Sequence, residues 1–254
     1  IQNMNVSNIL KVNGEIVVAV NISGRMKVKT LKLQFKDEFG LSWLQSAPKI
    51  NMLPTTDSRS AYPLSYAEQE ELFSYLPEHL RVMALYKINT GCREQEVVQL
   101  RWEWEAELSG TPHTMFILPE WLTKNGEERV VALNKEAMAV VNSVRGQDDE
   151  FVFTFRGKPI TKINNSGWRT ARKKAGLEQV RVHDLRHTFG KRLRSAGVNF
   201  EDRQDLLGHK SNSVTTDYSQ AELLNLVIAA NKICADEGSL SKTPEANVLI
   251  RKKG

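Results

Sequence analysis

The pattern of apolar and polar positions predicts a chain built mainly from short helices. Ser65 and Glu68 have the spacing of a capping box, so a helix is expected to begin near Tyr66, and we expect Pro77 to end it. Apolar residues at helical spacing predict a second helix over residues 79–91 that stops at Gly91, and a third over residues 93–102. The pattern over residues 65–102 therefore predicts three consecutive helices.

Residues 114–134, "TMFILPEWLTKNGEERVVALN", carry the clearest strand signal. Residues 129–133 are strand-like, and the preceding Lys-Asn-Gly-Glu sequence at 124–127 contains the residues that a tight hairpin turn favours, because Asn and Gly tolerate positive φ. The pattern therefore predicts an antiparallel hairpin with Lys124 at its tip.

Helices are predicted again over residues 134–146, 164–176 and 181–197. Asp184 lies near the start of the last of these, where its charge suits the positive end of the helix dipole. Gly208 is expected to end a short helix over residues 201–207, and Ser219 and Glu222 form a second capping box. That box opens a strongly apolar helix over residues 220–234.

The part of the chain before residue 61 is harder to interpret. Residues 14–24 alternate weakly, as in a strand, and apolar residues over 30–53 suit one face of a helix. Residues 48–60 have the composition of a linker. The stretch 1–30 matches no motif.

Composition excludes several classes of protein. The chain is 41% hydrophobic. This is enough for an ordinary core, and the longest apolar run, at positions 223–230, is too short to cross a bilayer. The N-terminus has no secretory pattern, and two cysteines, Cys92 and Cys234, indicate neither a disulfide framework nor a zinc site. A soluble protein of the reducing cytoplasm is expected.

Positive charge is concentrated in one segment. Residues 156–194 contain twelve Lys or Arg and two acids, so this segment carries a charge of +10, whereas the rest of the chain sums to −5. Such a segment is either a solvated basic face or a surface that binds phosphates.

Six polar residues stand out, although each also has an ordinary structural interpretation. Arg93 could pair with Glu96, Lys124 could be solvated, and His183 and Arg186 could be a surface pair at i,i+3 spacing. His209 could cap a helix, and Tyr218 could be a packed aromatic. His187 and Thr188 are interpreted as packing or helix-surface residues.

The order of the motifs changes this interpretation. The segments "TGCREQEVVQLRW", "TKNGEERVVALN", "HDLRHTFGKRL", "LLGHKS" and "TTDYSQ" resemble, in this succession, the tyrosine recombinase family and its phage integrase type in particular. The resemblance covers residues 65 to about 235. It implies a catalytic role for six residues: the arginines Arg93 and Arg186, the hairpin lysine Lys124, the histidines His183 and His209, and the nucleophile Tyr218.

The chemistry of these residue types agrees with the resemblance. Two guanidiniums can bind the non-bridging oxygens of a phosphodiester, and an imidazole can take up or return a proton near neutral pH. A phenol has a pKa of about 10, so surrounding cations would help Tyr218 lose its proton as it attacks phosphorus. The family role of Lys124 is to protonate the leaving 5′ oxygen. The expected product is a 3′-phosphotyrosyl link.

The resemblance implies an α+β fold that is predominantly helical, with a small three-stranded antiparallel β-sheet. Residues 61–236 would be the catalytic domain and 237–254 a polar tail. Family members usually carry a longer helical DNA-clamping domain first. Here residues 1–60 offer only a partial or divergent version with a linker, and 30–53 would be its final helix.

The expected partner is double-stranded DNA that carries attachment sites, bound as a homotetramer through the helix at 220–234, with a possible directionality factor. That helix could equally fold back on its own core. Arg169, Arg172, Lys173 and Lys174 are predicted to contact DNA phosphates. No metal or ATP is expected, since the sequence offers neither an acidic cluster for Mg²⁺ nor a P-loop. Two alternatives remain: an inactive DNA-binding remnant, or a type IB topoisomerase.

Overall fold

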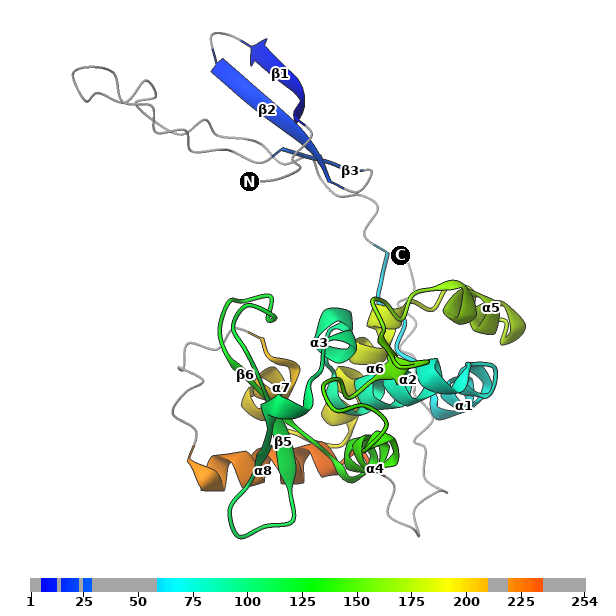
Figure 1. The fold of residues 1–254 in the computed structure, drawn as a ribbon, viewed down its shortest axis with the longest axis vertical. Coiled ribbons are helices and arrows are strands. Elements are labelled where there is room, and N and C mark those ends of the chain that lie inside the picture. Colours follow the sequence, from blue (N-terminus) through cyan, green and yellow to red (C-terminus); the bar gives the residue numbers. More distant parts are fainter. Residues whose placement is uncertain (1–5, 13–14, 23–24, 29–58, 210–218, 235–254) are drawn as a thin grey trace, which may run out of the picture. The chain divides into compact units, whose positions relative to one another are not determined.

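The computed structural model describes residues 6–12, 15–22, 25–28, 59–209 and 219–234. The chain divides into two compact units, residues 1–58 and residues 59–254. Each unit is described by itself below (Figure 1).

The first unit contains a three-stranded antiparallel sheet of consecutive hairpins. Its strands are β1 (Val6–Val12), β2 (Glu15–Ile22) and β3 (Arg25–Val28), with β2 in the centre. The alternating stretch at 14–24 thus marks the central strand, as its pattern indicates. The helix predicted over residues 30–53 and the linker up to residue 58 lie outside the described residues.

The second unit is mainly helical. Its helices are α1 (Tyr66–Ser74), α2 (Glu78–Thr90), α3 (Glu94–Val98), α4 (Lys135–Val144), α5 (Ser166–Lys174), α6 (Val182–Ser195), α7 (Phe200–Leu207) and α8 (Gln220–Asn231). With the sheet described next, this confirms the predicted α+β fold class.

Two small antiparallel sheets accompany the helices. One has three strands in the order β4 (Glu105–Glu107), β5 (Thr114–Leu118) and β6 (Arg129–Ala132). The other pairs β7 (Thr154–Phe155) with β8 (Lys158–Pro159). The connection from β5 to β6 runs over residues 119–128, so the turn at 124–127 lies within a longer loop than a tight hairpin needs.

The predicted helix ends are largely confirmed. Both capping boxes are present, with Ser65 and Ser219 each accepting a hydrogen bond from the backbone N–H of the glutamate three residues on. Gly91 and Gly208 end α2 and α7 in the left-handed conformation, with φ of 65° and 58°. Gly91 also has no room for a Cβ, which would lie 2.5 Å from the ring of Phe189.

Two predicted helix boundaries are wrong. The first helix ends at Ser74, and Pro77 is instead the N-cap of α2. The third ends at Val98 rather than near residue 102, because the backbone that follows pairs with residues 150–152. The Trp102 N–H donates to the Glu150 carbonyl at 3.1 Å and the Val152 N–H to the Leu100 carbonyl at 2.9 Å. Tertiary pairing has overridden the helical pattern.

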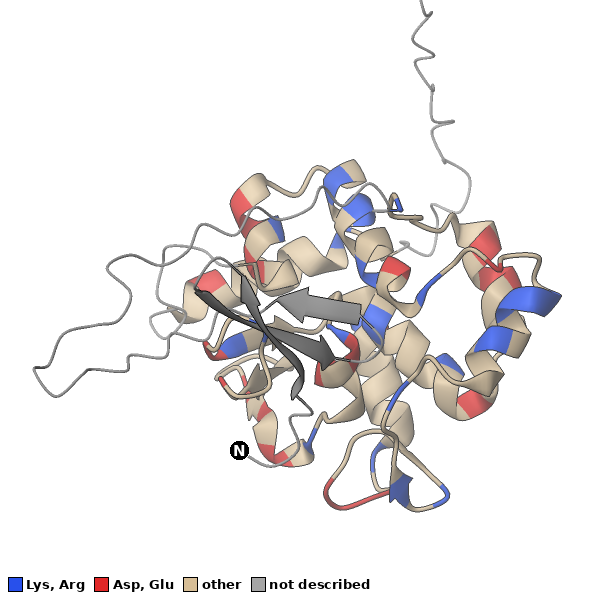
Figure 2. Ribbon diagram, turned by 90° about the horizontal axis from the view of Figure 1, so that it is seen from above, with Lys and Arg blue, Asp and Glu red and all other residues tan. Residues whose placement is uncertain are grey.

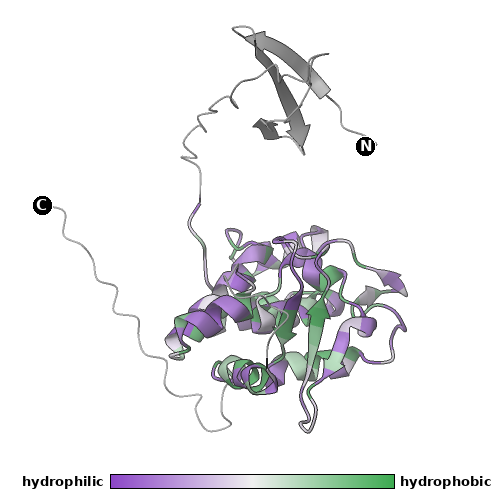
Figure 3. Cartoon of the chain, turned by 90° about the vertical axis from the view of Figure 1, so that its left-hand side faces the viewer, coloured by the Kyte–Doolittle hydropathy of each residue, from purple (hydrophilic) through white to green (hydrophobic). Residues whose placement is uncertain are grey.

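The helix α8 packs on the core of its own chain, next to α7 and β6 (Figures 1 and 3). Leu226, Val227 and Ala230 are buried in one cluster with Phe189 of α6 and Leu206 of α7. Polar contacts fix its end, since the Lys135 N–H donates to the Asn231 side chain at 2.8 Å. Within the described part of the chain, no helix is long and apolar enough to cross a bilayer.

Candidate active site

Arg93 occupies the N-cap of α3, at the turn that follows α2. Its backbone N–H and its guanidinium both donate to the carboxylate of Glu96, at 2.7 and 2.8 Å. The other guanidinium nitrogen donates to the Gly208 carbonyl at 3.2 Å. Glu96 thus binds the backbone N–H and one guanidinium nitrogen of Arg93, while the Gly208 carbonyl at the end of α7 binds the other guanidinium nitrogen.

Arg186 lies on α6 and is only 5% exposed. Its guanidinium donates to the Gly91 carbonyl at 2.6 Å and to the Leu207 carbonyl. Burial, together with the charges of Arg129 and Arg93, lowers the pKa of Arg186 to about 9, so the side chain remains charged at neutral pH. Two arginines from distant parts of the sequence therefore meet where α2 and α7 end.

His209 follows the left-handed cap of α7 directly. Partial burial comes first among the causes that lower the pKa of His209, followed by the charges of Arg186, Arg93 and Arg129. Gly208 is required before it, because a Cβ at this position would collide with the side chain of Arg129. His209 is accordingly a neutral imidazole at neutral pH beside both arginines.

His183 stands one helical turn before Arg186 on α6, and its imidazole contacts that of His187 edge to face, with ring centroids 4.7 Å apart. Partial burial and the charges of His187, Lys87 and Arg186 lower the pKa of His183 to about 4. At neutral pH the ring is therefore unprotonated. The ring contact of His187 is consistent with the packing role expected from the sequence.

Arg129, the first residue of β6, belongs to the same cluster, although no motif indicated it. It is 5% exposed and donates to Glu96 and, at 2.8 Å, to the Leu206 carbonyl. Glu96 is fully buried between Arg129 and Arg93. The expectation that Glu96 pairs with the arginines is therefore confirmed.

Lys87 is the second residue of the site that sequence reasoning missed. It lies on α2, is completely buried, and donates to the Cys92 carbonyl. The only signal in the sequence was a lysine close to the apolar positions of the helix predicted over residues 79–91.

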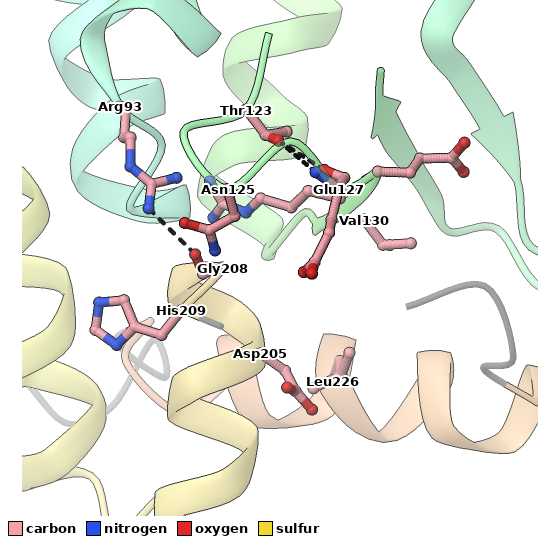
Figure 4. Close-up of a pocket in the computed structure, with 11 residues that line it drawn as sticks. Arg93, Thr123, Asn125, Glu127, Val130, Asp205, Gly208, His209 and Leu226 are labelled. Atoms are coloured by element: carbon pink, nitrogen blue, oxygen red, sulfur yellow. Dashed lines mark hydrogen bonds between the residues drawn. The ribbon is translucent and has the colours of Figure 1, made fainter. Parts of the chain in front are cut away.

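A pocket opens between the end of α7 and the loop that joins β5 to β6 (Figure 4). Arg93, Asn125, Gly208 and His209 are among the residues at this pocket, and the Arg93 guanidinium points toward the Gly208 carbonyl. The residues that line it are Arg93, Thr123, Asn125, Glu127, Glu128, Arg129, Val130, Asp205, Gly208, His209 and Leu226. The loop thus forms one wall of the pocket and the arginine cluster forms another.

Three of the six predicted catalytic residues, Arg93, Arg186 and His209, are brought together at the ends of α2 and α7, and His183 lies one helical turn before Arg186 on α6. Lys124 is exposed on the loop, between the pocket-lining residues Thr123 and Asn125. Tyr218 lies outside the described residues, and its role stays a prediction.

The predicted DNA-contacting residues lie on α5, where Lys and Arg gather at one side of the unit (Figure 2). Arg169 and Lys173 are exposed, and the Lys174 ammonium lies 5.9 Å from the centre of the Tyr75 ring. Arg172 instead donates to the carbonyls of its own chain at positions 178 and 180, at 2.8 and 2.5 Å. Arg172 therefore has a structural role whether or not it also contacts a phosphate.

No group of three or more His, Cys, Asp and Glu side chains is placed to hold a metal ion among the residues that the structure describes. Arg93, Arg129 and His209 line the pocket together with the carboxylates of Glu127, Glu128 and Asp205, and the arginine cluster at one wall suits an anion. The arrangement can bind a phosphate between Arg93, Arg186 and His209. The neutral imidazole of His183 lies one helical turn from Arg186.

Glu96 should carry much of the stability of this cluster, and we expect Glu96→Gln to lower the free energy of unfolding by about 3 kcal/mol, because it leaves buried arginine charge unpaired. Burial alone would raise the pKa of Glu96, but Arg129 and the hydrogen bonds from Arg93 outweigh this and lower it. The stabilisation is therefore present above the ordinary glutamate pKa and is lost as the pH falls through the lowered value. Urea unfolding between pH 7 and pH 3 measures both effects.

The matched control is Glu103→Gln, whose side chain is 67% exposed. An exposed carboxylate of this kind contributes little, so the free energy of unfolding should hardly change. Equal losses in the two variants would contradict the assignment of Glu96 as the anchor of the arginines.

Three curated proteins that resemble this chain are named as integrases or recombinases. The integrase of Salmonella phage P22 is 28% identical over 203 residues, which cover 75% of this chain and 51% of that protein. The shufflon-specific DNA recombinase of Escherichia coli is 28% identical over 178 residues, covering 68% and 44%. Tyrosine recombinase XerA of Pyrococcus furiosus is 26% identical over 234 residues, covering 88% and 77%. The chain spans about half the length of the first two relatives.

The fold is likewise shared with a solved structure. The integrase from mycobacterium phage Brujita superposes with a TM-score of 0.54 at 19% identity, over 74% of this chain and 61% of that one. The sequence profile of the phage integrase family matches residues 64–223, the stretch that contains the arginine cluster, both histidines and Tyr218. The chain belongs to the phage integrase family.

Proposed function

We propose that the chain is a site-specific DNA recombinase that cleaves and rejoins strands through a 3′-phosphotyrosyl intermediate. The observation that carries the proposal is the convergence of Arg93, Arg186 and His209 from three separate parts of the sequence on the ends of α2 and α7, with His183 one helical turn before Arg186 on α6. The similarity to integrases and recombinases supports the same activity.

The two arginines bind the scissile phosphate. Attack by an oxygen nucleophile builds charge on the non-bridging oxygens, and guanidiniums held in place by carbonyls and a carboxylate meet that charge without reorganising. His209, next to both guanidiniums, donates a hydrogen bond to the same oxygens. The cluster is thus arranged for a pentavalent phosphorane-like transition state rather than for the ground-state diester.

Two proton transfers complete the chemistry. The Tyr218 hydroxyl attacks phosphorus, its proton passes to neutral His183, and a P–O bond forms as the bond to the 5′ oxygen breaks. Lys124, on the loop that forms one wall of the pocket, protonates the departing 5′ oxygen. A second 5′-hydroxyl then attacks the phosphotyrosyl link by the reverse route and releases Tyr218.

The exposed cations of α5 bind the DNA backbone. Removing Arg169 and Lys173 together, as Arg169→Gln with Lys173→Gln, is expected to reduce the slope of log K against log salt concentration by about 1.8, since each lost phosphate contact contributes about 0.9. Binding to duplex DNA at several salt concentrations measures the slope. Arg81→Gln, which removes a partly exposed charge on α2, is the control, and an unchanged slope in the double variant would remove α5 from the interface.

We further propose that four chains act together. Recombining two duplexes requires four strand cleavages, and one chain offers one Tyr218, so a homotetramer supplies one nucleophile for each strand. Because α8 packs on its own core in the single chain, its exposed face, which includes Ile228, is the part open to a neighbouring protomer.

The strand exchange conserves bond energy in both directions, so a directionality factor would be needed to favour one direction. Acting on chromosomal attachment sites, the protein would work in the cytoplasm, at the nucleoid.

The test is covalent capture on a nicked suicide substrate, in which the short 5′-hydroxyl strand diffuses away after cleavage and traps the intermediate. Wild-type protein should form a denaturant-resistant adduct on its own attachment site, with DNA attached to the peptide that contains Tyr218. Binding without any adduct would instead favour an inactive remnant. Relaxation of supercoiled plasmid by a monomer would favour a type IB topoisomerase.

A further inference from the structure

Lys87 is a buried ionisable side chain at the site that the proposed chemistry does not use. It lies on α2 with an exposed fraction of 0%, so its ammonium cannot reach solvent or the DNA. Among the described residues, its hydrogen bond goes to the Cys92 carbonyl. A fully buried ammonium with a single carbonyl acceptor is costly, and this calls for a physical reason.

The position of that carbonyl gives the reason. Cys92 stands between Gly91, whose carbonyl accepts from Arg186, and Arg93, which begins α3. The bond from Lys87 therefore fixes the short turn that carries one arginine and anchors the other. Without it, the backbone of Cys92 would keep, among the described residues, only the long hydrogen bond from its N–H to the Thr90 hydroxyl, at 3.4 Å.

The charge of Lys87 also acts on Arg186 and His183. Burial, the largest cause, lowers the pKa of Lys87 to about 8. The ionisable groups that face it from α2, α3, α6 and the turn between α2 and α3 are Cys92, Arg186, Glu96, Glu94, His183 and His187. A neutral side chain of similar size at this position would give the protein a higher free energy of unfolding at pH 7. Stability therefore does not explain why a lysine is found here.

We propose that Lys87 is a positioning residue of the strand-cleavage site, which holds the turn at residues 91–93 and adds positive charge behind the two arginines. The proposal rests on the proposed function for its role in cleavage. Its effect on anion binding can be measured in the protein alone, whether or not cleavage occurs.

The first measurement is stability against pH in Lys87→Met, which fills a similar volume without charge. The folded-state pKa of Lys87 is below the unfolded one, so the unfolded chain binds the extra proton between about pH 8 and the ordinary lysine value. Lys87→Met should therefore have a higher Tm than wild type at pH 7, and the difference should shrink as the pH rises through this range. A lower Tm at pH 7 would mean that Lys87 is simply a structural residue.

The second measurement is binding of inorganic sulfate, which does not titrate in this range, followed through the NMR signals of the arginine Nε–H groups. Wild-type affinity should fall as the pH rises through 8, and Lys87→Met should bind about fivefold more weakly at pH 7 with no such step. Lys87→Gln, which keeps a donor without the charge, should still lack the step. Equal affinity and the same pH step in wild type and Lys87→Met would overturn the proposal.

The third measurement is the cleavage rate on the suicide substrate. Lys87→Met should cleave about tenfold more slowly than wild type at pH 7. Lys87→Gln should recover part of the loss, and Arg81→Met, a partly exposed position on the same helix, should cleave at the wild-type rate. If wild type forms no adduct, the proposed function fails while the sulfate and stability results still decide the role of Lys87. Unimpaired cleavage by Lys87→Met would contradict the positioning role.

Discussion

Tyr218→Phe protein is expected to bind attachment-site DNA as tightly as wild type and to form no covalent adduct with it. Phenylalanine keeps the ring but has no oxygen to bond to phosphorus, so the phosphotyrosyl link cannot form even though Arg93, Arg186 and His209 still hold the phosphate. The measurement pairs a gel-shift Kd with denaturing electrophoresis of the suicide-substrate reaction.

The matched control is Tyr66→Phe, because Tyr66 is exposed and its hydroxyl donates to the Ile233 carbonyl over a long 3.3 Å. This variant should form the adduct at the wild-type rate. An adduct in the Tyr218→Phe protein would assign the nucleophile to another residue and would overturn the mechanism proposed above.

Helix ends were the features most readily predicted from the sequence, because their causes are local. A serine and a glutamate three residues apart satisfy each other's backbone N–H groups, and both such boxes appear where they were expected. The same holds for the glycines at 91 and 208, which adopt positive φ at low cost. Local chemistry of this kind does not depend on the rest of the fold.

The early end of α3 could not be predicted in this way. Its sequence continues to favour a helix, but hydrogen bonds to residues 150–152, much later in the chain, are available only once the chain has folded.

The residues of the candidate site fall into the same two groups: those that the sequence indicates, and those that only the folded structure places at the site. Arg93, His183, Arg186 and His209 could be identified because the family resemblance assigns each of them a role, whereas it assigns none to Arg129 and Lys87, which act through burial and long-range contacts. Arg129 becomes part of the site only because β6 places it against Glu96 and the Leu206 carbonyl. A charged residue in an exposed-looking sequence context gives no sign of such an environment.

Arg186→Lys is expected to slow adduct formation by about a thousandfold while leaving the Kd for DNA almost unchanged, because loss of one preorganised donor typically costs about 10²–10³ in rate. The Arg186 guanidinium uses one nitrogen for the Gly91 carbonyl and another for the Leu207 carbonyl, and it still has donors for the phosphate. An ammonium has three donors and no planar fork, so it cannot hold both carbonyls and bind a developing oxyanion in the same geometry.

The size of this effect should distinguish a catalytic role of Arg186 from that of a positive charge that only binds DNA. Arg81→Lys, at a partly exposed arginine paired with Glu78 on α2, makes the same chemical change away from the pocket and should leave the rate of adduct formation at the wild-type value. Single-turnover rates at saturating protein isolate the chemical step from binding. If Arg186→Lys changed the Kd but not the single-turnover rate, Arg186 would serve to bind DNA, and transition-state stabilisation would have to be reassigned to Arg93 and His209 alone.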